Sequence, residues 1–403
     1  MSDQPSGFAV VPASHRDLSA AQRNRAHWAT MALFFIAGMM YASWGVHVPT
    51  VRDRFQLNPG LLSVALLAVA VGSIGAMFSS GAWIARMGTR RACLGGGLTM
   101  ALCAALILVV PAYWMLLVVL ALFGAGMATL DVAMNAEASA VENLLGRPVM
   151  SALHGMFSVG GMSGAALGGV LLSHGMAPVL HLALAAALSA LVLLLACPAV
   201  LPHVAPVPHP AERGAPASRW RSSALWALGG IALIALIAEG AMYDWATVYM
   251  RDVVGASAAA ASAAYAAFSG GMAAARFAGD AVRARFGAPQ LVLVSASLAC
   301  AGMIGALLLP YPVAALTGFT LMGLGLANMM PVLFAAAARV EGIHAAVGLA
   351  HVAGLAYFGL LLGPVVIGAV TQMTSLPLGL SVVALCAALV ACAGPKVLRR
   401  LRI

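Results

Sequence analysis

The sequence predicts an all-α integral membrane protein with twelve transmembrane helices in two parallel six-helix repeats. The first observation is composition: of 403 residues, 63% are hydrophobic and 8% are charged, whereas soluble domains carry roughly a quarter charged residues. The second is a series of apolar stretches about 20 residues long, enough for a helix to cross ~30 Å of hydrocarbon. The third is an internal repeat with a constant offset of 199 residues.

Each long apolar stretch is interpreted as one helix. The first is not expected to be a cleaved signal, because its apolar run is longer than a signal's hydrophobic region and no small-residue cleavage pattern follows it. The expected spans are 27–49, 58–84, 92–110, 113–138, 148–172, 178–200, 224–249, 258–281, 289–309, 313–338, 346–371 and 377–394.

The distribution of positive charge predicts the orientation. With the N-terminus in the cytoplasm, 17 of the 21 Lys and Arg residues face that side, Arg52, Arg54 and Arg251 face the other, and Arg276 lies within a span. The positive-inside rule therefore predicts that both termini lie in the cytoplasm. Basic loops beside anionic lipid explain the pI of 9.7, so no nucleic-acid partner is implied.

The repeat aligns the two halves of the chain without a gap. Arg52-Asp53 falls on Arg251-Asp252, and Gly72 falls on Gly271. Each half holds six spans, so both run in the same direction, related by an axis along the membrane normal. The expected parts are a cytoplasmic tail (1–26), a first bundle (27–200), a Pro- and Arg-rich cytoplasmic linker (201–223), a second bundle (224–394) and a second tail (395–403).

The loop "GAWIARMGTRR" (81–91) resembles the glycine-aspartate-arginine-glycine loop of the major facilitator superfamily, and the resemblance covers nearly the whole chain. It implies that this loop helps to lock the cytoplasmic gate. Ala85 stands where that family usually has Asp, and Ala284 repeats the difference in the second half. The gating residues expected from the resemblance are Arg86, Gly88, Arg285 and Gly287, with Asp280, in i,i+4 register with Arg276, as the replacement carboxylate.

Four further stretches narrow the resemblance. They are "ASWGVHVPTVRDRF", "DVAMNAEA", "SALHGMFSVGG" and "AEGAMYDWATVYMRD". Together they are similar to a bacterial inner-membrane group near the fucose permeases. That position in the family does not imply sugar transport.

Asp131 is the leading candidate for chemistry. It lies about 12 Å from the expected cytoplasmic end of the span 113–138, and a carboxylate at that depth costs ~2.5–3.5 kcal/mol unless it faces protein or water. Asn135 shares its helical face, with Gly124 and Ala128. The alternative is that Asp131 only fixes helix packing by hydrogen bonding.

Glu239 and His154 are the next candidates for proton coupling. Glu239 lies deep in the span 224–249, in i,i+4 register with Tyr243, and a structural role for it is an equal alternative. His154 lies at a depth similar to that of Asp131. A His–Asp pair at one level could pass protons, whereas a neutral packing histidine is the competing interpretation.

The resemblance also implies which helices line a central cavity. Tyr41 and Trp44 lie on the first span, Tyr243 on the seventh and Asn328 on the tenth. Aromatic faces suit stacking against an organic solute, and for each residue alone core or interface packing is an equal alternative. The expected solute contacts are Trp44, Tyr41, Asn135, Tyr243 and Asn328.

These features predict a proton-coupled secondary transporter of a small organic solute, monomeric in the lipid bilayer, with alternating access around a central site. No nucleotide-binding fingerprint or metal-ligand spacing is present, so neither cofactor nor metal is expected. An enzyme is disfavoured, because the protease-like "GMSG" (161–164) arises readily in Gly-rich helices. The alternatives are a drug or metabolite exporter working as a proton antiporter, and a membrane sensor without transport.

Overall fold

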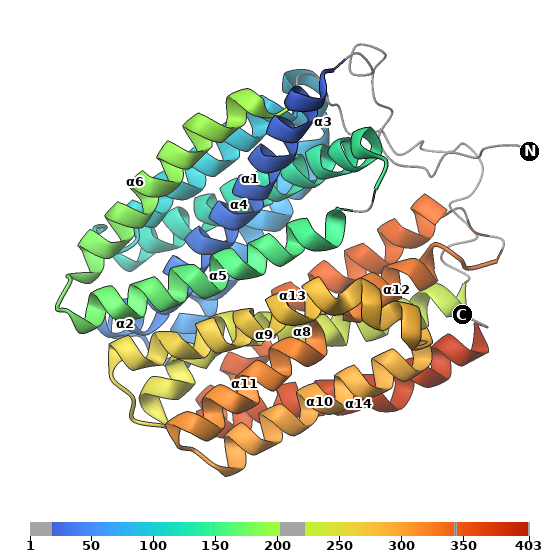
Figure 1. Cartoon of the computed structure of the whole chain (residues 1–403). Helices are drawn as coiled ribbons and strands as arrows, with labels where there is room; N and C mark the ends of the chain where they lie inside the picture. Colours follow the sequence, from blue (N-terminus) through green and yellow to red (C-terminus); the bar gives the residue numbers. More distant parts are fainter. Residues whose placement is uncertain (1–17, 148, 202–221, 342, 344, 402–403) are drawn as a thin grey trace, which may run out of the picture.

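The computed structural model describes residues 18–147, 149–201, 222–341, 343 and 345–401, and these residues form helices joined by short connections (Figure 1). The helices of the first half are α1 (Ala20–Val46), α2 (Val48–Arg54), α3 (Pro59–Leu106), α4 (Tyr113–Leu145), α5 (Met150–Ser173) and α6 (Pro178–Ala196), with a 3₁₀ turn, η2 (Cys197–Ala199). Those of the second are α8 (Ser223–Asp252), α9 (Ala258–Arg285), α10 (Ala288–Leu308), α11 (Pro312–Leu326), α12 (Met329–Ala337), α13 (Ala345–Met373) and α14 (Leu376–Arg400).

The two halves form two bundles that face each other, as Figure 1 shows. Between them, α5 packs against α9 and α3 packs against α13.

Ser19 begins α1 with a capping box, in which its hydroxyl accepts a hydrogen bond from the Gln22 backbone N–H and the Gln22 side chain accepts one from the Ser19 backbone N–H. The expected linker lies almost wholly outside the described residues, so its conformation remains a prediction.

Ten helical segments of the described chain are long and apolar enough to cross a membrane. Of the other two predicted spans, 92–110 is helical up to Leu106, where α3 ends, and 258–281 lies within α9. Large apolar side chains are exposed on the outer faces, among them Phe78 at 90% and Val313 at 72%. This is the pattern of a helical bundle whose solvent is lipid. The all-α membrane fold expected from the sequence is therefore confirmed.

Three predicted boundaries differ from the structure. The second and third spans run together in α3, interrupted only at Gly88, whose φ of 80° and ψ of 160° are not helical and suit glycine. The first span continues through His47 into α2. The tenth breaks at Asn328 into α11 and α12. Hydropathy alone does not report such breaks, because the residues on either side are equally apolar.

The internal repeat appears in the closest helix contacts. A Cβ on Gly72 would overlap the carbonyl oxygen of Ala121, and a Cβ on Gly271 would overlap that of Thr320. In the same way, Gly124 meets the backbone of Val69, and Gly323 meets that of Phe268. In each comparison both partners are offset by 199 residues. The α3–α4 contact is thus repeated in the α9–α11 contact, with glycine at the same places because only glycine allows the approach.

Candidate functional site

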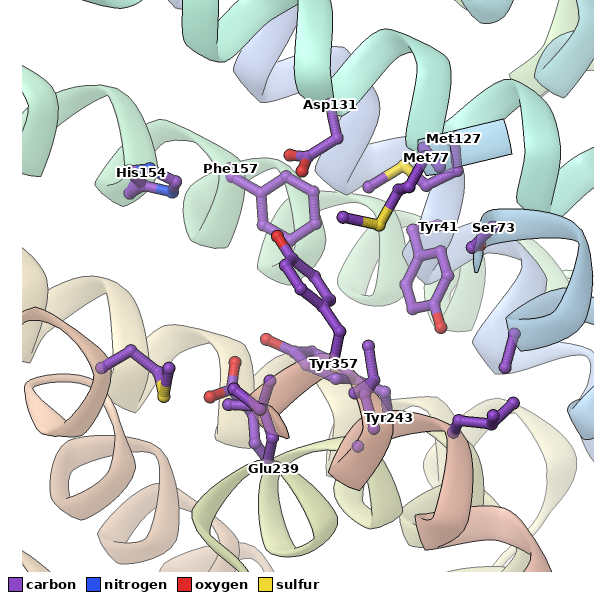
Figure 2. A pocket seen from close by; sticks show the side chains of 18 of the residues that line it. Tyr41, Ser73, Met77, Met127, Asp131, His154, Phe157, Glu239, Tyr243 and Tyr357 are labelled. Atoms are coloured by element: carbon purple, nitrogen blue, oxygen red, sulfur yellow. The ribbon is translucent and has the colours of Figure 1, made fainter. Parts of the chain in front are cut away.

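A cavity of about 640 Å³ lies between the two halves. That volume is within the range of small-molecule sites. Its walls come from α1, α3, α4 and α5 on one side, and from α8, α9, α13 and the α11–α12 junction on the other. Figure 2 shows the side chains of some of the residues that line it. Sequence-predicted residues on the wall are Tyr41, Asp131, His154, Glu239, Tyr243, Arg276 and Asn328.

Asp131 is on the α4 wall of the cavity (Figure 2). Asn135, one turn later, donates from Nδ2 to Asp131 Oδ1 at 3.1 Å and to the Asp131 backbone oxygen at 2.8 Å. No Lys, Arg or His of the described chain pairs with this carboxylate. Asn135 itself is not on the cavity wall, so its role here is to hold Asp131.

The two later carboxylates of α4 serve the scaffold. Glu137 is fully buried and accepts from Thr89 Oγ1 at 3.1 Å and from the backbone N–H of Leu201 at 2.7 Å. Glu142 accepts from the backbone N–H groups of Val149 and Met150 at 2.8 and 2.9 Å. Negative charge at a helix N-terminus is stabilising, so Glu142 fixes the start of α5.

Arg276 joins the two halves beside the cavity. Its Nη2 lies 3.7 Å from Glu239 Oε1, and its Nη1 donates to Ser158 Oγ at 2.8 Å and to the His154 backbone oxygen at 3.3 Å. Arg276 and Glu239 belong to the second half, whereas Ser158 and His154 lie on α5 of the first. The predicted partner of Arg276, Asp280, has a side chain outside the described part of the structure.

His154 is on the cavity wall, but no hydrogen bond joins it to Asp131 among the described residues. Its ring packs edge-on against Phe34, with the centroids 5.1 Å apart. The direct His–Asp pair considered from the sequence is therefore not formed in this structure.

The predicted aromatic contacts divide into two groups. Tyr41 and Tyr243 are on the wall, with their rings edge-to-face at a centroid distance of 6.0 Å. Asn328 is also on the wall, at the helix break between α11 and α12. Trp44 is only 1% exposed, packs beside Phe123, and is not among the lining residues. Trp44 is thus a core residue in this structure, because the inward turn of α1 is filled by neighbouring helices.

One end of the molecule, opposite the end at which α1 begins and α14 ends, is held by a reciprocal ion-pair cluster. Arg52 of α2 pairs with Asp252 at the end of α8, and Arg251 of α8 pairs with Asp53 of α2. Arg52 also contacts Asp53 at 3.2 Å. We call these four residues the Arg–Asp lock.

Comparison with known proteins decides the family. Residues 30–344 match the model of the Major Facilitator Superfamily. The chain belongs to this superfamily. It is 33% identical over 375 residues to an uncharacterised MFS-type transporter of Yersinia pestis, covering 92% of this chain and 95% of the relative. It is 30% identical over 360 residues to the membrane protein MosC of Rhizobium meliloti, covering 89% and 87%. The protein is therefore a multi-pass membrane transporter.

Solved structures of superfamily members share the fold. A bacterial homologue of the human lysosomal transporter Spinster, inward-facing and unoccupied, superposes with a TM-score of 0.72 at 14% identity, covering 96% of this chain and 98% of that one. The Escherichia coli fucose:proton symporter superposes with a TM-score of 0.61 at 17% identity, covering 92% and 97%. Identities this low establish the architecture alone.

The superfamily loop is a kink in α3 here. After Gly88, Arg90 donates to the backbone oxygens of Pro198 and Val200 at 2.7 and 2.8 Å. These bonds tie the loop to the end of its own bundle. Arg86 is exposed beside the kink, Arg285 is the exposed last residue of α9, and Gly287 precedes α10. Within the described part of the chain, no hydrogen bond or ion pair joins these three residues to the other half.

Several lining residues were not anticipated from the sequence. Tyr357 projects from α13 into the cavity, close enough to Asp131 for an electrostatic interaction (Figure 2). Asp244 of α8 is also on the wall and is 8% exposed. Phe157, Met77 and Met127 add apolar surface. An aromatic residue between the glycines of the α13 stretch was the one sequence signal that could have drawn attention to Tyr357.

Proposed function

We propose that the protein is a secondary active transporter that moves a small organic solute across the inner membrane of a bacterium by alternating access, driven by protons. The observation that carries the proposal is Asp131, an ionisable side chain on the cavity wall that no cation of the described chain neutralises. Burying an unpaired charge is costly, so this carboxylate has reason to take up a proton when the cavity is closed to water. Opening to one side lets it release the proton there.

The remaining residues have supporting roles in this proposal. Glu239 and Arg276 form a pair whose contacts with α5 change when the halves rock, and His154 assists proton movement from the same helix. Tyr41, Tyr243 and Asn328 contact the solute. Arg86, Gly88, Arg285, Gly287 and Asp280 act at the cytoplasmic gate, and the protein works as a monomer.

The positive-inside rule supports cytoplasmic termini. With that orientation the Arg–Asp lock lies at the periplasmic end, and the cavity extends toward Glu142 and Met150 at the cytoplasmic end. The proposed state is therefore inward-facing. The position near the fucose permeases stays a prediction from the sequence stretches, because the fold shared with the fucose symporter at 17% identity establishes the architecture alone. It assigns no substrate.

The test begins with the solute. A thermal-shift screen of the purified protein against sugars, carboxylates, amphiphiles and siderophore-like compounds identifies a ligand, because specific binding stabilises the folded state. Flux of that ligand in proteoliposomes is then measured with and without a pH gradient. The direction of accumulation separates uptake from export by proton antiport. A ligand that binds and is never moved would instead indicate a sensor.

Asp131→Asn is the decisive variant. The amide imitates the protonated acid at nearly constant volume, so we expect loss of gradient-driven accumulation, with solute exchange retained. Glu341→Gln removes one carboxylate from an exposed position and is the matched control; it should behave as the wild type. If the Asn variant still accumulates solute with the wild-type pH dependence, Asp131 is structural and Glu239 is the next candidate.

A further inference from the structure

The charged groups on the cavity wall are mostly acidic. Among the described lining residues there are four carboxylates and one guanidinium: Asp131, Glu142, Glu239, Asp244 and Arg276. Arg276 is already engaged by Glu239 and by Ser158. Glu142 is engaged by the backbone of α5. The two remaining carboxylates, Asp131 and Asp244, therefore determine the net charge that a bound solute meets.

Neither remaining carboxylate is paired with a cationic side chain of the described residues. Asp131 accepts only from the neutral amide of Asn135. Asp244 is 8% exposed, lines the cavity, and has no hydrogen bond or ion pair with any described residue. A buried carboxylate is stable when it is protonated or when it is paired with a positive charge. The described residues supply no positive charge at these positions, so a positively charged group of the bound solute can supply it.

The rest of the wall is aromatic and sulfur-rich. Five aromatic residues line it, namely Tyr41, Phe157, Tyr243, Phe334 and Tyr357, and five methionines, namely Met77, Met127, Met134, Met150 and Met330. Aromatic faces attract cations through the ring quadrupole. Methionine side chains adapt to apolar bodies of different shape.

We propose that the transported solute is an organic cation, an amine-bearing compound whose positive group lies beside Asp131 or Asp244 and whose body contacts the aromatic and methionine wall. This rests on the proposed transport function and adds the substrate class. The same wall disfavours carboxylates and phosphates, since an anion would meet two unpaired negative charges in a desolvated site. A neutral sugar would leave both carboxylates uncompensated unless each held a proton.

The sign of the electrostatic potential in the cavity can be measured without knowing the solute. Ser73→Cys and Met330→Cys place a thiol on the wall from either half, and no described lining residue is a cysteine. Each variant is treated in detergent with cationic trimethylammonioethyl methanethiosulfonate and with anionic sulfonatoethyl methanethiosulfonate. Rates are normalised to those of glutathione, and the wild-type reaction at the native cysteines is subtracted. We expect the cationic reagent to be faster by roughly tenfold, since acidic clefts concentrate cations.

The source of that preference is assigned by removing charges one at a time. Asp131→Asn and Asp244→Asn, each added to the cysteine variants, should lower the cation preference several-fold, whereas Glu341→Gln should leave it unchanged. Two cysteine positions guard against a single variant that misfolds. Equal normalised rates for the two reagents, or a faster anionic reagent, would overturn the proposal.

A charge-matched ligand screen separates the substrate class from the transport function. Thermal shifts are compared for sets that share a carbon skeleton, such as phenethylamine, phenylethanol and phenylacetate, or glucosamine, glucose and glucuronate. We expect stabilisation by amines only. It should be reduced in Asp131→Asn, which still binds and exchanges the solute, and lost when Asp131→Asn and Asp244→Asn are combined. If neutral or anionic members stabilise the protein and are moved in proteoliposomes, the proposed cationic substrate class is wrong and the proposed transport function stands. If a cation binds to the cavity and is not moved in proteoliposomes, the proposed transport function is wrong and the proposed cation-binding site stands.

Discussion

Asp131, Glu137 and Glu142 lie within about three turns of one helix, yet their surroundings give them different roles. Asp131 faces the cavity with an amide as its only described hydrogen-bond donor. Glu137 is enclosed and accepts from Thr89 and Leu201, and Glu142 fixes the start of α5. What a carboxylate does in this bundle depends on the donors supplied by neighbouring helices, which are distant in sequence. Depth in the membrane alone does not separate the three.

Glu137→Gln should lower stability. The amide would turn an N–H₂ donor toward either the Thr89 hydroxyl or the Leu201 N–H, and one buried donor would lose its acceptor. Such a loss costs about 1–3 kcal/mol. We expect a lower midpoint of thermal unfolding in detergent for Glu137→Gln, with Glu341→Gln unchanged as the exposed control. A midpoint equal to that of the wild type would show that Glu137 does not anchor the bundle.

The site was only partly predictable at the residue scale. Asp131, Glu239 and Tyr243 could be found because polar groups in long apolar spans are costly and therefore informative. Trp44 could not be assigned to the core, since its helical face looks the same in sequence as that of Tyr41. Tyr357 and Asp244 reach the cavity only through the packing of α13 and α8. The Glu239–Arg276 pair joins residues of different helices, and no local pattern reports it.

At the scale of elements, hydropathy located the spans and missed their interruptions. Gly88 takes a positive φ within α3, and the chain continues as helix on both sides. A loop rich in Gly and Arg gives the same pattern whether it is open or is a single-residue kink. Thr89 and Arg90 then bind Glu137 and the ends of the same bundle. A buried glutamate thus meets this loop, in which Ala85 replaces the usual acid.

The α3–α4 contact gives a prediction with an internal control. A methyl group on Gly72 would overlap the backbone of Ala121, whereas one on Gly75, almost one turn away on the same helix, would meet nothing within 4 Å. Overpacking typically costs about 1–3 kcal/mol, and alanine favours helix by roughly 1 kcal/mol over glycine. Gly72→Ala should therefore lower the thermal unfolding midpoint, and Gly75→Ala should keep or raise it. Equal shifts of the unfolding midpoint for the two variants would show that α3 and α4 can move apart to admit the methyl group without loss of stability.

At the scale of the whole molecule, the repeat explains the geometry of the Arg–Asp lock. Arg52 corresponds to Arg251 and Asp53 to Asp252, with an offset of 199 residues. A two-fold axis along the membrane normal exchanges the pair Arg52–Asp252 with the pair Arg251–Asp53, so one duplicated dipeptide forms both bridges where the halves meet. The sequence revealed the equivalence of the dipeptides. Their contact could not be predicted, because it exists only when this end of the molecule is closed.

The lock should bias the transport cycle. The Arg and Asp side chains are 21–42% exposed, and exposed ion pairs contribute roughly 0.2–1 kcal/mol each. Removing both bridges with Asp53→Asn and Asp252→Asn should therefore raise access to the cavity from that end by roughly 2- to 30-fold. Access is measured as the labelling rate of Ser73→Cys by an impermeant thiol reagent, added outside right-side-out membrane vesicles. The stability of each bundle should stay the same, since the bridges lie between the bundles.

Charge exchange separates the lock from a general effect of lost charge. Arg52→Asp alone sets three carboxylates against Arg251 and should speed labelling further. Arg52→Asp combined with Asp252→Arg gives an acidic α2 facing a basic α8, so attraction between the halves returns and labelling should slow again. Arg54→Gln removes an exposed arginine of α2 that donates to the Val110 backbone oxygen and lies over the ring of Phe55, both within the first half. This variant should label as slowly as Ser73→Cys alone. If the exchanged pair labels as fast as Arg52→Asp, the four residues meet at this end without holding it closed.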